Sequence, residues 1–187
     1  MSSPVMSSDA VASRVRFLRD CYYEAISAQG QQVANKWDEE RNFLRGSASD
    51  WLPTIRPTLR GIRDRCGKPN WDGQGATAVS DEVIAISEEV LVTLFWLAQA
   101  GTPPPDIVPE ADGEICLSWT EDDARTFSIS IGERGKINFA GQFGHLGSIH
   151  GWKPIDTSNP NALESSLNEI AEYLENLYPP VARRRAA

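Results

Sequence analysis

The sequence predicts an α+β fold: N-terminal helices, a central helix, an antiparallel β-meander of about four or five strands, and a C-terminal helix packed on the sheet. Three observations predict it. Apolar residues recur at helical spacing before about residue 100 and again after residue 160. In between, apolar and polar residues alternate, as they do in half-buried strands. The turns that join the alternating stretches are short, and short connections make neighbouring strands antiparallel.

The first third of the chain predicts helices and a basic connection. Residues 8–28 and 31–44 have helical spacing, and a short helix from 57 to 66 fits inside the long connection that follows. We assign residues 1–66 to an N-terminal helical segment. The connection carries arginines that could either receive a phosphate or acidic group or pair with the acidic remainder of the chain: Arg56, Arg60, Arg63 and Arg65.

The most constrained stretch runs from Pro69 to Ala76. Its Asp72-Gly73 dipeptide is a strong turn signal, because glycine tolerates positive φ and the Asp carboxylate can accept backbone amides two residues on. Trp71 is expected to bury most of its ring and to donate its indole N–H. A turn fixed in this way could bind a partner or serve only as a connector. As binding candidates we take Trp71, Asp72, Gly73, Gln74 and Gly75.

Together with the helix after Ser80, the proline-rich break and the meander, this stretch resembles a set of uncharacterised bacterial proteins with a Trp-Asp-Gly-aromatic-Gly-Ala signature. The resemblance covers about residues 69–152. Gln74 stands where those proteins usually have an aromatic residue, so one stacking contact is expected to be absent. The family has no established activity, and the resemblance therefore implies no site residues.

A buried central helix is predicted after the turn. Ser80 is a good N-cap, and Asp81 and Glu82 suit the positive end of a helix. The apolar face is wide, as expected of a largely buried helix. Gly101 is predicted to end the helix, and three prolines after it prevent continuation.

Three stretches of alternating residues predict the central strands, with apolar positions at Ile115, Leu117, Trp119, Phe127, Ile129, Ile131, Ile137, Phe139 and Phe143. Residues 106–109 are expected to add an edge strand, since prolines suit edges, and residues 148–152 to add the last strand. The other face of the sheet is small and polar and could face water or receive a partner. It is formed by Cys116, Ser118, Thr126, Ser128, Ser130, Asn138 and Gln142.

The final helix is predicted to open at Asn159-Pro160, an N-cap followed by proline at the first helical position. A leucine-rich stripe makes it amphipathic, with its glutamates off the stripe. We assign residues 67–180 to the α+β domain and 181–187 to a disordered basic tail.

The chain of 187 residues carries a net charge of −8 at pH 7. An acidic protein is poorly suited to nucleic-acid binding, which depends on cations that neutralise phosphates, so direct nucleic-acid binding is not expected. The charge is compatible with a partner protein that has a basic surface, and equally with solubility alone. The acidic turn of Glu121, Asp122 and Asp123 joins the binding candidates.

The three cysteines lie far apart and contain no Cys-x-x-Cys pair, so neither a disulfide framework nor a zinc site is indicated. We expect no metal and no cofactor. The N-terminus lacks the features of a signal peptide, and no apolar run is long enough to span a membrane. We expect a cytoplasmic protein, which could form a homodimer.

Catalytic candidates are sparse. Ser148 and His150 would share a strand face, and Asp72 could orient the histidine, as in a Ser-His-Asp constellation. No Gly-x-Ser-x-Gly nucleophile elbow supports this assignment. His145 and His150, five residues apart, would not share one face of a regular strand.

We therefore predict a protein that acts without catalysis, by binding another protein through its acidic surface. Antitoxins, immunity proteins and anti-CRISPR-like inhibitors of bacterial defence complexes act in this way, and a bacterial or mobile-element origin fits them. The alternative is a small hydrolase-like enzyme that uses His150 with Ser148 or Asp72, and a scaffold or dimerisation module is the third hypothesis.

Overall fold

A computed structural model describes residues 51–98, 102–133 and 135–178 of the chain. The chain divides into two compact units, Met1–Ser47 and Ala48–Ala187, and the described residues all belong to the second. The helices predicted at 8–28 and 31–44 and the basic tail at 181–187 lie outside the described residues. The central helix, predicted to end at Gly101, ends earlier, at Leu97, because the backbone of the C-cap residue Ala98 is already extended.

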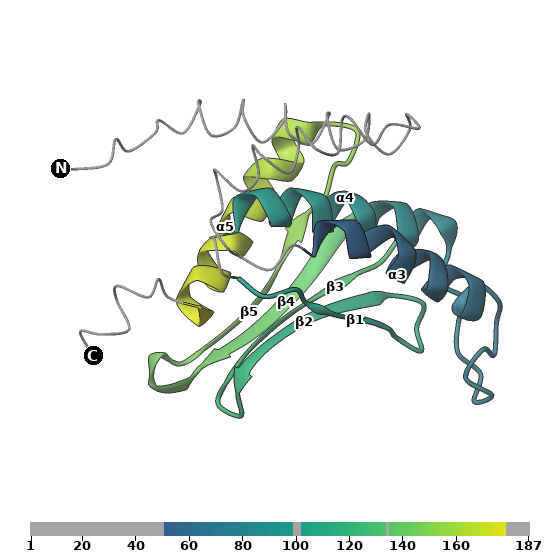
Figure 1. The fold of residues 1–187 in the computed structure, drawn as a ribbon, viewed down its shortest axis with the longest axis horizontal. Helices are drawn as coiled ribbons and strands as arrows, with labels where there is room; N and C mark the ends of the chain where they lie inside the picture. The colour runs from purple at the N-terminus through teal and green to yellow at the C-terminus, as the bar shows by residue number, and fades with distance from the viewer. Residues whose placement is uncertain (1–50, 99–101, 134, 179–187) are drawn as a thin grey trace. The chain divides into compact units, whose positions relative to one another are not determined.

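The predicted α+β class is confirmed: three helices and a five-stranded antiparallel sheet make up the described fold (Figure 1). The strands pair in chain order, so the sheet is a simple meander. In sequence the elements are α3 (Leu52–Cys66), α4 (Asp81–Leu97), β1 (Asp106–Pro109), β2 (Ile115–Asp122), β3 (Arg125–Ile131), β4 (Lys136–Phe143), η1 (Gly144–Leu146), β5 (Ser148–Pro154) and α5 (Pro160–Leu177). None of the described helices is long and apolar enough to cross a membrane.

The three helices lie together on one face of the sheet (Figure 1). All nine predicted apolar strand positions are buried there. Two glycines make room for phenylalanine rings on this covered face. Gly141 lies opposite Phe127 and Gly151 opposite Phe139, and a Cβ atom on either glycine would come within 2.7 Å of the ring it faces. Tyr173 of α5 packs on both rings, with centroid distances of 5.8 and 5.5 Å.

Both N-caps predicted for the long helices are confirmed. The Ser80 hydroxyl accepts the backbone N–H of Val83 at 3.2 Å, and the Asn159 side chain accepts the first free N–H groups of α5. The leucine stripe of α5 is buried as expected. Glu164 was expected off the stripe but is buried, because it lies one turn before Leu167 on the packed side.

Helix α3 is longer than predicted. It begins at Leu52 and includes Pro57, where the sequence indicated a connection. Pro57 is tolerated because it lies in the second turn, where it forgoes only one backbone bond. The helix packs against α4 through the Trp51 and Phe95 rings, 5.1 Å apart, and through an ion pair from Arg56 to Glu88 at 2.5 Å. It therefore belongs with the sheet, although the sequence placed it in the segment 1–66.

Candidate functional site

One face of the sheet is covered by none of the described helices. We call it the open face. The strand register places two full cross-strand rows on it: Asp106, Ser118, Ser128, Ala140 and His150, and beside them Val108, Cys116, Ser130, Asn138 and Trp152. Most of these side chains are small, so a partner could approach the strand backbones closely. The polar face predicted from the sequence is confirmed and extends to both edge strands.

Large apolar side chains stand at the two ends of the second row. Val108 on β1 is 45% exposed and Trp152 on β5 is 63% exposed. Each belongs to an edge strand, and three intervening strands separate them. Single exposed side chains of this size are normal on protein surfaces. Exposure alone therefore does not mark a binding site, and the residues around each side chain must be considered.

The β1–β2 turn bears an acidic corner, which we define as Glu110, Asp112 and Glu114. It borders an open depression of about 410 Å³, which is lined by Glu110, Ala111, Asp112, Cys116 and Ser130. The Ser130 hydroxyl donates a hydrogen bond to the Glu114 carboxylate. Lys136 lies across the same face on β4, so the negative charge is concentrated on the half formed by β1 and β2.

Cys116, whose thiol is a potential nucleophile, lines the same depression. Partial burial raises the pKa of its thiol, and the charge of Glu110 raises the pKa further. A thiol is reactive as the thiolate, which these two effects disfavour. The acidic corner is therefore a poor setting for a cysteine nucleophile, whereas its negative charge favours contact with lysine or arginine side chains of a partner.

The turn from Asn70 to Ala76 is held by its own side chains. The Asp72 carboxylate accepts the N–H groups of Gln74 at 2.8 Å and Ala76 at 3.1 Å, and the Asn70 amide oxygen accepts that of Gly75 at 2.8 Å. These bonds to Gln74 and Ala76 lower the pKa of Asp72 because they stabilise its charged form. The backbone needs positive φ at Gly73 and Gly75, and also at Asn70.

Trp71 fixes the base of this turn. Its indole N–H donates to the Thr77 carbonyl at 2.9 Å, as predicted, but the ring is only half-buried. The next residues join the turn to the acidic corner, since the Thr77 N–H donates to the Ala111 carbonyl at 2.8 Å. The predicted binding residues 71–75 thus lie beside a group of carboxylates that the sequence analysis did not select.

The second predicted group lies at the far end of β2. Glu121 forms an ion pair with Arg125 at 2.6 Å, and the Asp122 carboxylate accepts the Ala124 N–H at 2.9 Å. Arg125 also donates to the carbonyls of Asn176 and Leu177 in the last turn of α5. Two of the three acidic residues therefore hold the hairpin, whereas Asp123 is exposed at its tip. The length of β2, at about 3.3 Å per residue, separates this hairpin from the acidic corner.

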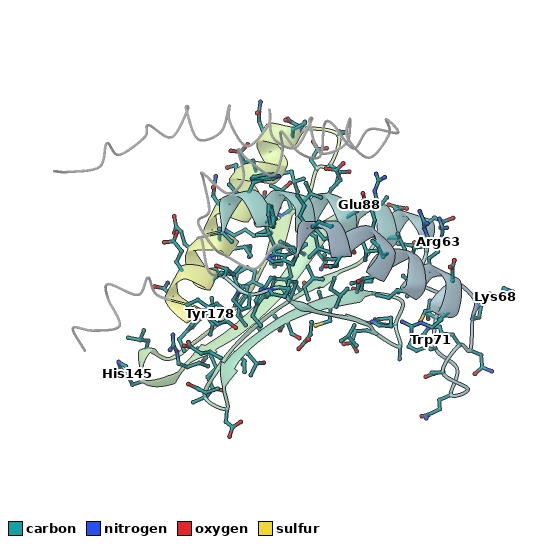
Figure 2. The ribbon with its side chains drawn as sticks, viewed as in Figure 1. Arg63, Lys68, Trp71, Glu88, His145 and Tyr178 are labelled. Atoms are coloured by element: carbon teal, nitrogen blue, oxygen red, sulfur yellow. The ribbon has the colours of Figure 1, made fainter. Side chains whose placement is uncertain are left out.

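The catalytic candidates do not assemble. Ser148 and His150 do share one face of β5, as predicted, and both are exposed. Asp72 lies beside the β1–β2 turn, and two strands separate β2 from β5, which corresponds to about 14 Å at the usual strand spacing. Figure 2 shows Trp71, the neighbour of Asp72, and His145, which precedes β5, at opposite sides of the molecule. Within the described ranges no three histidine, cysteine or carboxylate side chains are grouped to hold a metal ion.

Comparison of the chain with protein families, with curated proteins and with solved structures gives no significant match. The residues that the sequence analysis missed are Asp106, Val108 and the acidic corner. Alternation on both sides of the β1–β2 turn could have placed them on the polar face, because residues 106, 108 and 110 share a side with 114 and 116.

Proposed function

We propose that this protein acts without catalysis by binding another protein, and that the partner presents a basic surface to the β1–β2 half of the open face. The observation that carries the proposal is the acidic corner around its open depression, next to the exposed Val108. Antitoxins, immunity proteins and inhibitors of bacterial defence complexes remain the proposed class, since such proteins occupy a surface of their target.

Three physical features support this site. Carboxylates around a depression can receive arginine or lysine side chains, and a bidentate arginine–carboxylate pair adds geometric specificity. The small side chains of the open face let the partner's backbone come close. The adjoining turn at 70–76 is already ordered by its own hydrogen bonds, so less conformational entropy is lost when it is contacted.

The first step of the test identifies the partner. A photo-crosslinking amino acid in place of Val108 should capture it in the cells that produce this protein, and the same group in place of Ser165, on the exposed side of α5, should not. The captured protein is then purified, and its affinity for the unmodified chain is measured by calorimetry at low and high salt.

The second step tests the site. Glu110→Gln with Asp112→Asn should weaken binding at least about tenfold and reduce its salt dependence, because exposed charges attract most strongly at low salt. The control, Glu172→Gln with Asp64→Asn, removes the same charge elsewhere and should stay near the unmodified affinity. Ser118→Arg should block docking, and Ser165→Arg should not. Equal effects of site and control variants would refute the proposal.

A further inference from the structure

The outer edge of β5 is the second feature of the sheet that suggests a partner. Two hydrogen bonds fix which backbone groups point outward: the Phe143 N–H donates to the Gly147 carbonyl at 2.9 Å, and the Ile155 N–H donates to the Gly135 carbonyl at 2.8 Å. Between them the register of β4 and β5 is unbroken. Bonded and non-bonded pairs alternate in an antiparallel ladder, so residues 149, 151 and 153 bond to β4. Ser148, His150 and Trp152 therefore direct their N–H and C=O groups away from the sheet.

Within the described part of the chain, this edge has little of the usual protection against strand addition. Among the described strands β5 pairs with β4 alone, it has no bulge, and its proline stands at the last position. The side chain of Lys153 turns to the covered face, where it pairs with Glu169 of α5. Natural edge strands are commonly blocked by a free lysine, an internal proline, a bulge, an inward-pointing charge or short length. Of these, β5 has only the inward charge of Lys153, which is paired with Glu169.

The opposite edge is protected. Strand β1 has only four residues, ends in Pro109 and follows three consecutive prolines. It also carries Asp106, and the acidic corner adjoins it. One edge of the same sheet is therefore closed to another strand and charged, whereas the other is open and carries no acidic side chain.

We propose that β5 pairs with β5 of a second copy of this chain, antiparallel about a two-fold axis, to form one continuous sheet through both copies. A second copy suits this edge because each outward N–H group then meets an outward C=O group of the same strand type. The contact also keeps the two acidic corners at the outer edges, so the repulsion between two acidic chains is small.

The proposal accounts for the exposure of Trp152. Whether the axis passes His150 or Gly151, each Trp152 comes opposite a serine or histidine side chain of the second copy, on the open face. Directly opposed side chains in an antiparallel pair are in contact range. Trp152 would thereby lose much of the surface that is 63% exposed in the single chain. A two-fold contact closes on itself and leaves only the protected β1 edges.

The experiment measures the oligomeric state of the full chain by sedimentation velocity, from micromolar to several hundred micromolar protein. The unmodified chain should form a dimer. Trp152→Lys should weaken dimerisation at least about tenfold, since it removes an aromatic contact and places a lysine on the pairing edge, where lysine opposes strand addition. Val108→Lys is the matched control, because Val108 is an exposed apolar residue of the same row on the other edge. It should leave the dimer intact.

A second variant acts on the backbone alone. His150→Pro removes one outward N–H group but no bond to β4, so it should abolish the dimer while circular dichroism shows the fold retained. Hydrogen exchange in the unmodified chain should show amides 148, 150 and 152 protected at high concentration and unprotected on dilution. A chain that stays monomeric, or a dimer that survives Trp152→Lys with these amides unprotected, would overturn the proposal.

Discussion

The two faces of the sheet are built from the same strands and differ at every second residue. On the covered face the strands present phenylalanine, tryptophan and isoleucine to the helices, and these side chains are almost completely buried. On the open face the same strands present serine, threonine, cysteine and asparagine, most of them half-exposed. Stability is therefore concentrated on the covered face, and the open face can carry recognition residues at little cost to folding.

Phe127 and Ser128 provide the sharpest form of this comparison. Phe127 is 1% exposed and its ring packs among those of Trp119, Phe139, Phe143 and Tyr173. Phe127→Ala should lower the free energy of unfolding by about 3–5 kcal/mol, through lost burial and a residual cavity. Ser128→Ala, one residue on, should change it by less than about 0.5 kcal/mol. Urea unfolding followed by fluorescence measures both; similar losses would contradict the division between the faces.

A second pair of variants adds atoms instead of removing them. A Cβ on Gly141 would lie 2.7 Å from the Phe127 ring and 2.9 Å from the Phe143 ring. Gly141→Ala should therefore destabilise the protein by about 1–3 kcal/mol, because the rings cannot both stay in place. Ala140→Ser, on the open face, should cost less than about 0.5 kcal/mol. Thermal unfolding measures the stability of both variants. An unchanged melting temperature for Gly141→Ala would contradict the prediction.

The covered face should also respond to high pH. The hydrogen bond from the Tyr173 hydroxyl to Glu169, at 2.5 Å, raises the pKa of Tyr173 from its ordinary 10.0 to about 12, and burial adds to the effect. This contribution to stability is complete below pH 10 and is lost as the pH rises from 10 to 12. The difference in unfolding free energy between the unmodified chain and Tyr173→Phe should shrink over that range. A difference independent of pH would argue against the bond.

The smallest effect is expected on the open face, at Cys116. Because burial and Glu110 raise the pKa of this thiol above its ordinary 9.0, iodoacetamide should alkylate it more slowly than a free thiol at pH 8. Glu110→Gln should speed the reaction about twofold, since an exposed charge is partly screened. Asp123→Asn, at the other end of β2, should not change it. Peptide mass spectrometry separates Cys116 from the other cysteines.

The sequence was sufficient to predict the strands and their two faces, because a period of two assigns each side chain to a side. The start of helix α3 was harder to predict, because Pro53 and Pro57 are residues that usually interrupt helices. The burial that stabilises this helix depends on its packing against α4, which the sequence alone does not show. The acidic corner was missed for a related reason. Its carboxylates, Glu110, Asp112 and Glu114, are separated by Ala111 and Gly113 and do not form a continuous acidic run. The continuous run at 121–123 attracts attention in the sequence, but Glu121 and Asp122 stabilise their own hairpin.

The bonds of Arg125 in this hairpin also affect how the fold resists mechanical unfolding. Its guanidinium holds carbonyls at the end of α5, 51 and 52 positions further along the chain. Those carbonyls form the negative end of the helix, where a cation binds favourably. A motor protein that pulls on the chain beyond residue 178 would meet these bonds before it could unwind α5. Arg125 of the β2–β3 hairpin therefore adds to the mechanical resistance that the buried Leu174 and Leu177 give to that end of the chain.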